Sequence, residues 1–367
     1  MTIYWLTCIA TIFTTDFALR VKHDKKNMKY YLLLAFFSSL PLNILCSIRY
    51  NVGKDYFEYK RYFELIASQS VSREKGSLYF KLISSRKEIG QLEYLYYKLN
   101  KLIAYLGGDY RWLFAICSTI FLVFIFLAIF HDSPFPNMSV YFLVSMSYYF
   151  IFMNGMRQMI GCAILLFSLR YVEKRKLLPF VLCVILAAGF HTTCLPFIII
   201  YWIANFDFKP RRVAIMTIII IICSNIFGGI LTRILYLTPY VKYIGSDYDS
   251  GSQGRIILLI NLLIVVLGAI FYDVDDKRYK IYFNIQIGAL WVTILTGKVV
   301  LISRMRWMLG LPSIILLPLI FTKIKSRKNQ QLIEAMIIGL YFVYCTYRVV
   351  VFNSNTVLPY QTIFGRS

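Results

Sequence analysis

Charged and polar residues that could do chemistry occur in a few short clusters along this chain of 367 residues. Arginine has a planar guanidinium group that binds phosphate or carboxylate through two parallel hydrogen bonds. Histidine can exchange a proton near neutral pH, and a carboxylate can act as a base or orient hydroxyl groups. The candidate residues are Arg49, Tyr50, Asp55, Tyr56, Arg157, Gln158, His191, Arg304, Arg306, Arg348 and Tyr360.

Each candidate also has an ordinary structural explanation. An arginine at the end of a membrane helix commonly extends to the lipid head groups. His191 has the surroundings of a turn residue, Asp55 those of a solvated loop carboxylate, and tyrosines are frequent at a membrane interface. Arg304 and Arg306 are two positions apart on an expected helix, so at most one can point squarely into a given pocket. The chemistry therefore depends on whether the surrounding elements bring the clusters together.

Those elements are apolar and long. Hydrophobic residues make up 59% of the chain and charged residues 16%, whereas a soluble domain carries about a quarter charged residues. Apolar runs such as 111–131, 213–231 and 255–272 match the roughly 20 residues that a helix needs to cross a bilayer. In lipid the backbone must satisfy its own hydrogen bonds, so these runs are expected to be helices. The first, Thr2–Leu19, lacks the features of a cleaved signal peptide and is expected to be retained.

The predicted fold is an all-α integral membrane protein, a polytopic bundle of about 12 (10–13) transmembrane helices. Residues 1–367 are expected to form a single polytopic membrane domain. The expected spans are 2–19, 30–48, 111–131, 138–154, 156–172, 177–190, 193–205, 213–231, 255–272, 281–297, 305–322 and 332–350.

The distribution of charge predicts the orientation. The net charge is +22, and basic residues gather in the short connections 20–29, 173–177, 206–212, 273–280 and 323–331. The positive-inside rule places such loops in the cytoplasm, and this use of basic residues argues against nucleic acid as a partner. With the spans given above, an even number of helices separates successive basic loops, so all five loops are expected on the same side of the membrane. Both termini and every candidate cluster are then expected at the external face.

Residues 49–110 form a long external loop after the second expected helix. Loops of this length cross the membrane largely regardless of their charge. Within the loop, 91–106 is too short and too polar to span a bilayer, and an interfacial amphipathic helix is expected there. The leucines on its expected apolar face are Leu92, Leu95, Leu99, Leu102 and Leu106.

The eight cysteines predict neither a disulfide framework nor a metal centre. All lie in or beside apolar runs, and no two have the CxxC spacing. They are interpreted as small buried hydrophobic residues. No metal and no other cofactor is expected.

Five strings carry a family resemblance along nearly the whole chain. In order they are IRYNVGKDYFEYKRYF, MRQMIGCAILLFSLRYVEKRK, LAAGFHTTCLP, SRMRWMLGLPSIILLP and VLPYQTIF. Together they resemble the EpsG family, Wzy-type polymerases of bacterial O-antigen, capsule and exopolysaccharide synthesis. The resemblance implies a glycosyltransferase that acts without a metal at the external, periplasmic face of the bacterial inner membrane.

The resemblance also implies the substrate and the roles of the site residues. The enzyme would transfer a growing glycan from undecaprenyl diphosphate to a hydroxyl of a new undecaprenyl-diphosphate-linked oligosaccharide, releasing lipid diphosphate. His191 would be the general base, with Asp55 as a second base or an orienter of sugar hydroxyls. The arginines and Gln158 would hold the diphosphate, and Tyr50, Tyr56 and Tyr360 would contact sugar rings.

Other functions remain open at the level of sequence. A flippase or transporter of the lipid-linked unit would carry ionisable residues near the middle of the bilayer, whereas the helix interiors here are nearly uncharged. An O-antigen ligase would use the same donor, and a membrane O-acyltransferase would also use a histidine. The repeat-unit sugars, the linkage and its stereochemistry, the pathway, the oligomeric state and the docking of a chain-length regulator are not predicted.

Overall fold

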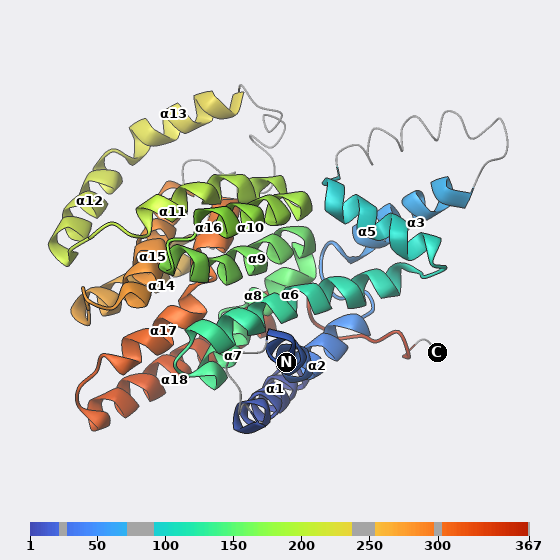
Figure 1. The fold of residues 1–367 in the computed structure, drawn as a ribbon, viewed down its shortest axis with the longest axis horizontal. Helices are drawn as coiled ribbons and strands as arrows, with labels where there is room; N and C mark the ends of the chain where they lie inside the picture. The colour runs from blue at the N-terminus through green and yellow to red at the C-terminus, as the bar shows by residue number, and fades with distance from the viewer. Residues whose placement is uncertain (22–27, 72–91, 237–253, 297–302, 366–367) are drawn as a thin grey trace.

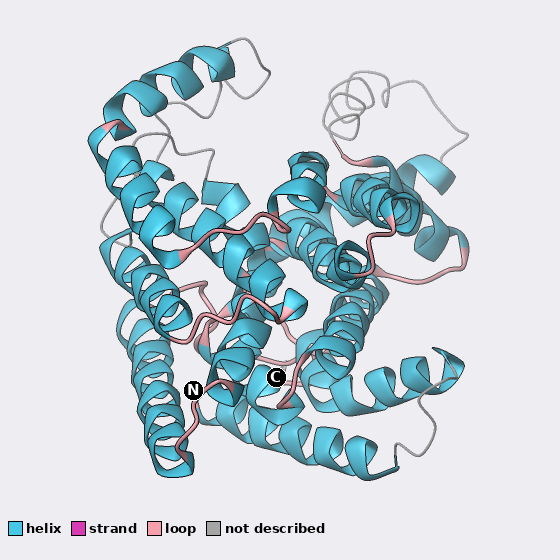
Figure 2. Cartoon of the chain, turned by 60° about the vertical axis from the view of Figure 1, so that its left-hand side comes forward, coloured by secondary structure: helices cyan, strands magenta, loops and turns pink. Residues whose placement is uncertain are grey.

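The protein is helical throughout the part of the chain that the computed structural model describes (Figures 1 and 2). The described residues are 1–21, 28–71, 92–236, 254–296 and 303–365. In its first half the helices are α1 (Thr2–Val21), α2 (Met28–Ser47), α3 (Tyr56–Val71), α5 (Tyr94–Tyr105), α6 (Tyr110–Asp132), α7 (Pro136–Ser145), α8 (Tyr148–Asn154) and α9 (Met156–Glu173). The second half contains α10 (Leu177–Phe190), the 3₁₀ helix η2 (Thr192–Ile199), α11 (Ile200–Ile203), α12 (Pro210–Ile222), α13 (Ser224–Tyr236), α14 (Gly254–Ile270), α15 (Lys277–Thr296), α16 (Ser303–Gly310), α17 (Ser313–Thr322) and α18 (Arg327–Phe352).

The core lies around α6 and α9, which cross the centre of the molecule (Figure 1). Helix α6 packs against α2 on one side and α9 on the other, and α10 covers α9. Phe121 of α6 and Phe152 of α8 stack with ring centroids 4.3 Å apart, and both side chains are fully buried. Offset aromatic stacking of this kind adds to the dispersion energy of a close-packed interior.

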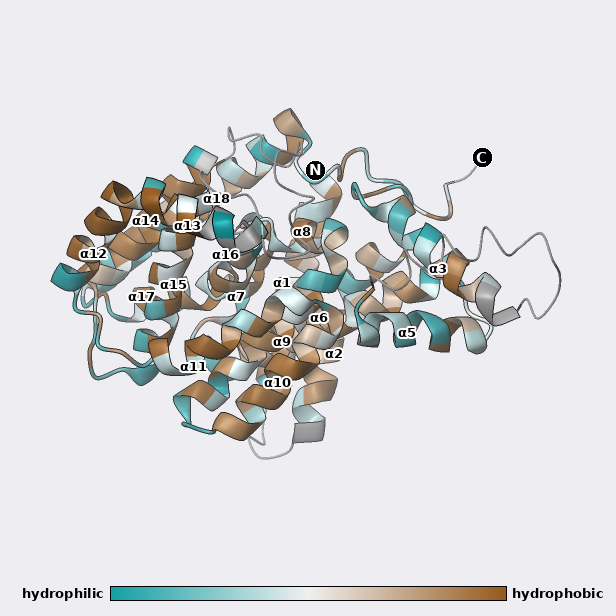
Figure 3. Ribbon diagram, turned by 90° about the horizontal axis from the view of Figure 1, so that it is seen from above, coloured by the Kyte–Doolittle hydropathy of each residue, from teal (hydrophilic) through white to brown (hydrophobic). Residues whose placement is uncertain are grey.

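The outer helices carry large apolar side chains on their exposed faces. Phe13 of α1 is 71% exposed, Ile222 of α12 is 72% exposed and Met336 of α18 is 64% exposed. Hydrophobic colouring covers much of α10, α12 and α14 in Figure 3. Apolar surface on this scale would aggregate in water and is typical of helices that contact lipid.

Five segments of the described residues are long and apolar enough to cross a membrane, and the pair α12–α13 would make a sixth if it forms one bent span. The five are Thr2–Val21, Tyr30–Ser47, Tyr110–Asp132, Arg304–Thr322 and Arg327–Phe352. Several apolar helices of this kind are typical of a membrane protein. The expected count of about 12 spans stays a prediction.

Several expected spans are interrupted. The expected span 138–154 is divided between α7 and α8 at Ser147, whose φ of 69° is left-handed. Pro312 stands between α16 and α17, where a proline removes a helical hydrogen bond and clashes with the preceding turn. The expected span 193–205 is mostly a 3₁₀ helix that contains Pro196, and α12 meets α13 at an angle of 66°.

Four of the five basic loops meet at one end of the bundle. Arg278 pairs with Glu173 at 3.2 Å, which joins loops 273–280 and 173–177. Lys323 pairs with Asp273 at 2.9 Å and with Asp276 at 2.6 Å, which adds loop 323–331. The Tyr272 hydroxyl donates to Asp207, which adds loop 206–212. This placement agrees with the alternation expected from the charges, and the assignment of that end to the cytoplasm stays a prediction.

Residues 49–110 contain two described helices, α3 and α5, and 72–91 lie outside the described part. Helix α5 falls inside the range 91–106 that is expected to be helical. Tyr96, Asn100 and Ile103 are buried, whereas Leu102 and Leu106 of the expected apolar face are exposed. The buried residues face the protein, where α5 packs against α3, α6 and α10. Its interfacial position stays a prediction.

Candidate functional site

The loop after α2 reaches the site because of a glycine. Gly53 has φ +100°, and its N–H donates to the Thr356 carbonyl at 2.9 Å. A Cβ at this position would lie 2.7 Å from the Met153 carbonyl oxygen. Both the left-handed backbone and the close approach exclude a side chain, so the loop can sit against the end of α8 only with glycine here.

Asn154, at the end of α8, joins this loop to the C-terminal tail. Its side-chain oxygen accepts from the Lys54 N–H at 2.5 Å, and its amide donates to the Asn355 carbonyl at 3.0 Å. The Tyr59 hydroxyl donates to the Asn154 carbonyl at 2.6 Å. Three segments remote in the chain are therefore held at the start of α9.

Glu93 is the residue at the centre of the first polar group. One carboxylate oxygen lies 2.5 Å from a guanidinium nitrogen of Arg157, and the other lies 2.6 Å from Nδ1 of His191. The Glu93 side chain is 8% exposed, that of His191 9% and that of Arg157 25%. Burial raises the pKa of Glu93, but the hydrogen bond with His191 and the charge of Arg157 outweigh it and hold the pKa below its usual value.

His191 occupies the turn where α10 ends. Its backbone is extended, with φ −158°, and its N–H closes the last turn of α10 on the Ala187 carbonyl. The 3₁₀ helix η2 begins at the next residue, so the imidazole projects at the junction of two helices. Its Nε2 is buried and has no hydrogen-bond partner among the described residues.

Asp55 and Arg304 complete this group. Burial raises the pKa of the Asp55 carboxyl, while the nearby charges of Lys54, Arg157 and Arg304 act in the opposite direction. Asp55 thus lies within electrostatic reach of both arginines. The structure brings together four of the residues predicted from sequence, which are Asp55, Arg157, His191 and Arg304.

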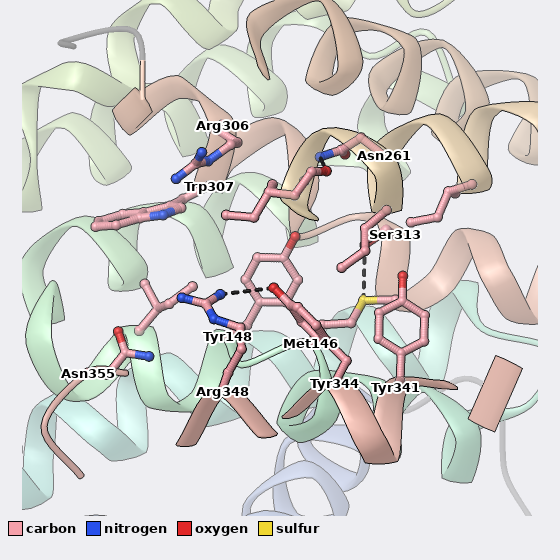
Figure 4. Close-up of a pocket in the computed structure, with 15 residues that line it drawn as sticks. Met146, Tyr148, Asn261, Arg306, Trp307, Ser313, Tyr341, Tyr344, Arg348 and Asn355 are labelled. Carbon is pink, nitrogen blue, oxygen red and sulfur yellow. Dashed lines mark hydrogen bonds between the residues drawn. The ribbon is translucent and has the colours of Figure 1, made fainter. Parts of the chain in front are cut away.

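A second group surrounds a cavity of about 150 Å³ (Figure 4). Arg306 approaches it from α16 and Arg348 from α18, and a guanidinium nitrogen of Arg348 donates to the Tyr344 hydroxyl at 2.9 Å. The cavity wall also includes Tyr148, Asn261, Trp307, Ser313, Tyr341, Asn355 and the isoleucines Ile257, Ile260 and Ile264. None of the described residues that line it is acidic.

The two groups share helix α16, which the start of α9 contacts through Gln158 and Gly155. Arg306 lines the cavity and Arg304 does not, as expected for neighbours two positions apart on a helix. Gln158 is buried and donates to the Arg304 carbonyl at 2.8 Å, which ties α9 to α16. Gly155 leaves room for Trp307, whose ring would lie 3.0 Å from a Cβ at that position.

Two predicted ligand residues lie in the interior. Arg49 is fully buried, donates to the Met153 carbonyl at 2.8 Å and lies over the Phe114 ring at 4.8 Å from its centroid. Tyr56 is also fully buried and stacks on Phe114 at 4.8 Å. The loop folds back on α6 and α8, so both side chains pack there, and their contacts with a substrate stay predictions.

The remaining predicted contacts take part in packing as well. Tyr360 donates its hydroxyl to the Leu45 carbonyl at 2.6 Å, and the Tyr50 N–H donates to the Gln361 carbonyl at 2.9 Å. These bonds pin the C-terminal tail to the end of α2. Gln158 is occupied by its bond to α16.

Sequence reasoning missed Glu93, Tyr148 and Tyr344. The only signal for Glu93 is the scarcity of acidic residues, 18 against 40 basic ones, which gives weight to any glutamate beside an apolar helix. Tyrosines are too numerous, at 29, for any one of them to stand out. The two cavity tyrosines therefore carry no signal of their own.

Comparison with known proteins agrees with the resemblance drawn from the sequence strings. The model of the EpsG family matches residues 6–362. No curated protein and no solved structure matches this chain. Because the family match spans nearly the whole chain, the protein belongs to the EpsG family, a family of Wzy-like polymerases.

Proposed function

We propose that this protein joins oligosaccharide repeat units carried on undecaprenyl diphosphate, at the periplasmic face of the bacterial inner membrane. The growing glycan is the donor, and a hydroxyl of a new lipid-linked unit is the acceptor. Membership of a Wzy-like polymerase family supports the reaction class. The observation that carries the proposal is the cavity with two arginines and no described acidic residue, one helix away from a buried histidine.

The two groups of residues differ in net charge, and we assign each of them a different part of the reaction. In the first, Arg157 and Arg304 are balanced by Glu93 and Asp55, so this group suits proton transfer more than the binding of an anion. In the cavity, the described lining residues include Arg306 and Arg348 but no carboxylate, so the lining is positively charged and suits a diphosphate. Of the arginines predicted from sequence to hold the diphosphate, this assignment keeps Arg306 and Arg348 in that role.

The proposed step has one bond formed and one broken. Nε2 of His191 accepts the proton of the acceptor hydroxyl, whose oxygen attacks the anomeric carbon of the donor. The bond from that carbon to the diphosphate oxygen breaks, and the electron pair leaves on the diphosphate. Arg306 and Arg348 stabilise the charge that develops there. Asp55 orients hydroxyl groups of the acceptor sugar.

Reconstitution tests the proposal. Purified protein in liposomes, supplied with a synthetic lipid-linked repeat unit, is expected to make a ladder of longer glycans. Arg306→Ala and Arg348→Ala are each expected to lower turnover by about 10²–10³, the usual cost of one charge-stabilising donor. The matched control is Arg211→Ala, an exposed arginine at the start of α12 near the opposite end of the bundle. Movement of the lipid-linked unit across the bilayer without new bonds would instead identify a flippase.

A further inference from the structure

Glu93 is buried and uses both carboxylate oxygens at the first polar group. One oxygen receives a hydrogen bond from Arg157 at 2.5 Å, and the other faces Nδ1 of His191 at 2.6 Å. The three side chains come from α5, α9 and the end of α10, so no two are neighbours in sequence. Glu93 belongs to the long connection 49–110, and its contacts with two residues of distant helices point to a role at the site beyond that of the connection.

The contact determines which imidazole nitrogen carries the proton. An ionised carboxylate can only accept, so the short bond requires the hydrogen on Nδ1. Nε2 then presents its lone pair, and it is the buried atom without a partner among the described residues. A neutral imidazole held in this tautomer is a base with a defined direction of attack.

Arg157 keeps Glu93 in the ionised form. A buried carboxyl group without a cation would tend to take up a proton, but here the guanidinium lies on its far oxygen. The charge of Glu93 is therefore present when His191 becomes an imidazolium ion. An anion at this position stabilises that ion, as the buried aspartate does in serine-protease triads.

We propose that Glu93 is a positioning residue for the polymerisation reaction: it fixes the His191 tautomer with a free Nε2 and stabilises the imidazolium that forms when the acceptor hydroxyl is deprotonated. This inference rests on the proposed function, because it requires His191 to be the base. It makes the 49–110 segment part of the reaction machinery, since that segment supplies Glu93.

The experiment is a double-mutant cycle in the reconstituted polymerisation assay. The proteins compared are the unchanged chain, Glu93→Gln, His191→Gln and the double variant. Glutamine keeps the size of Glu93 but removes the charge, and its amide can donate to the ring and favour the wrong tautomer. Turnover is expected to fall at least tenfold and up to about 10⁴-fold, with little change in donor binding.

The double variant separates positioning from a merely structural role. If Glu93 acts through His191, Glu93→Gln is expected to have no further effect once His191 is glutamine, to within about threefold. The matched control is Glu64→Gln, an exposed glutamate on α3 that is expected to keep full turnover. The same cycle is repeated with Glu93→Asp, which keeps the charge but has a shorter side chain. Alone, Glu93→Asp is expected to lower turnover less than Glu93→Gln does. In the His191→Gln background it is expected to have no further effect.

The outcomes distinguish this inference from the proposed function. Full turnover of Glu93→Gln, or an equal loss from it with and without His191, would overturn the positioning role while the polymerase remained. Full turnover of His191→Gln would overturn the base assignment and the inference with it. If Glu93→Gln does not fold, as judged by its elution in detergent, the Glu93→Asp cycle decides by the same criteria.

Discussion

At the scale of single residues, the arginines differ in the charges around them. Arg157 is paired with Glu93, whereas Arg306 and Arg348 share a cavity without an acidic residue among its described walls. Arg49 is buried against backbone carbonyls and an aromatic ring. Identical side chains therefore stand in three different surroundings in one protein, and these surroundings are the basis of the separate roles proposed for them.

Lysine substitution tests the geometry of the cavity. Arg306→Lys and Arg348→Lys keep the positive charge but lose the planar fork that binds a diphosphate through two hydrogen bonds. We expect both variants to regain only a small part of the turnover lost in the alanine variants, measured as glycan ladders from liposomes. Full turnover of the lysine variants would show that charge alone is sufficient.

Acid is expected to weaken the contact that Glu93 makes. Its pKa is below the usual value, because the hydrogen bond with His191 and the charge of Arg157 outweigh burial, so the contact stabilises the folded state above the usual glutamate pKa of about 4.3. That stability is lost as pH falls through the lowered pKa. The melting temperature of the unchanged protein should exceed that of Glu93→Gln at neutral pH, and the gap should close only below about pH 4. A gap that does not change with pH would contradict the ionised form of Glu93.

At the scale of elements, the site depends on turns and close helix contacts. Helix α5 lies against α10 because Gly189 has no side chain, and a Cβ there would lie 2.4 Å from Cδ1 of Leu95. This contact sets the distance between Glu93, at the start of α5, and His191, at the end of α10. Packing at one helix pair thus determines the geometry of the proposed base.

Gly189→Ala is expected to push α5 away and to lower turnover severalfold. Leu95→Ala in the same chain opens the space again and is expected to restore most of the loss, since the two changes compensate in volume. Both variants are compared with the unchanged protein in the reconstituted assay. Leu95→Ala alone serves as the control. If the double variant does not recover turnover, the contact between Gly189 and Leu95 does not set the geometry needed for the reaction.

Gly53→Ala is expected to destabilise the protein by more than the cost of its backbone alone. A left-handed alanine costs about 1–2 kcal/mol, and Gly53 adds a clash with the Met153 carbonyl. Gly107 is a matched control, because its φ is +76° and nothing lies within 4 Å of a Cβ there. The fall in melting temperature should be larger for Gly53→Ala than for Gly107→Ala. An equal fall in melting temperature for the two variants would mean that the loop around Gly53 can move away from the Met153 carbonyl without a loss of stability.

At the scale of the whole molecule, the two ends of the bundle differ in chemistry. The basic loops pair with carboxylates at one end, through Arg278 and Lys323. The polar groups around Glu93 and Arg306 lie toward the other end, where α9 begins. Helix α9 has 18 residues, which separates the ends by about 27 Å, close to the thickness of a bilayer core.

Cysteine labelling tests the orientation. Gln361 at the tail and Lys328 at the start of α18 are both exposed, and they lie toward opposite ends of that helix. In a chain whose half-buried Cys183 and Cys223 are replaced by serine, Gln361→Cys should react with an impermeant reagent in intact cells. Lys328→Cys should react only after the membrane is opened. The reverse pattern would place the proposed site in the cytoplasm.

A helical membrane protein whose unusual polar residues cluster at helix ends could be predicted from the order of residues alone. Both conclusions depend on local properties, since the length and polarity of a segment are visible without its neighbours. Asp55, Arg157, His191 and Arg304 could be selected for the same reason. The break at Ser147 and the packing of α5 against α3, α6 and α10 could not be predicted, because contacts between helices chose among local alternatives.

Which residues share a site follows from contacts that form only in the folded chain. Glu93 lies 64 residues before Arg157 and 98 before His191, and no local pattern encodes contacts at such separations. The same holds for the burial of Arg49 and Tyr56, which follows from a loop folded onto α6 and α8. Charge pairing and burial act through space, so the proposed division of the arginines between proton transfer and anion binding can be drawn only from the folded chain.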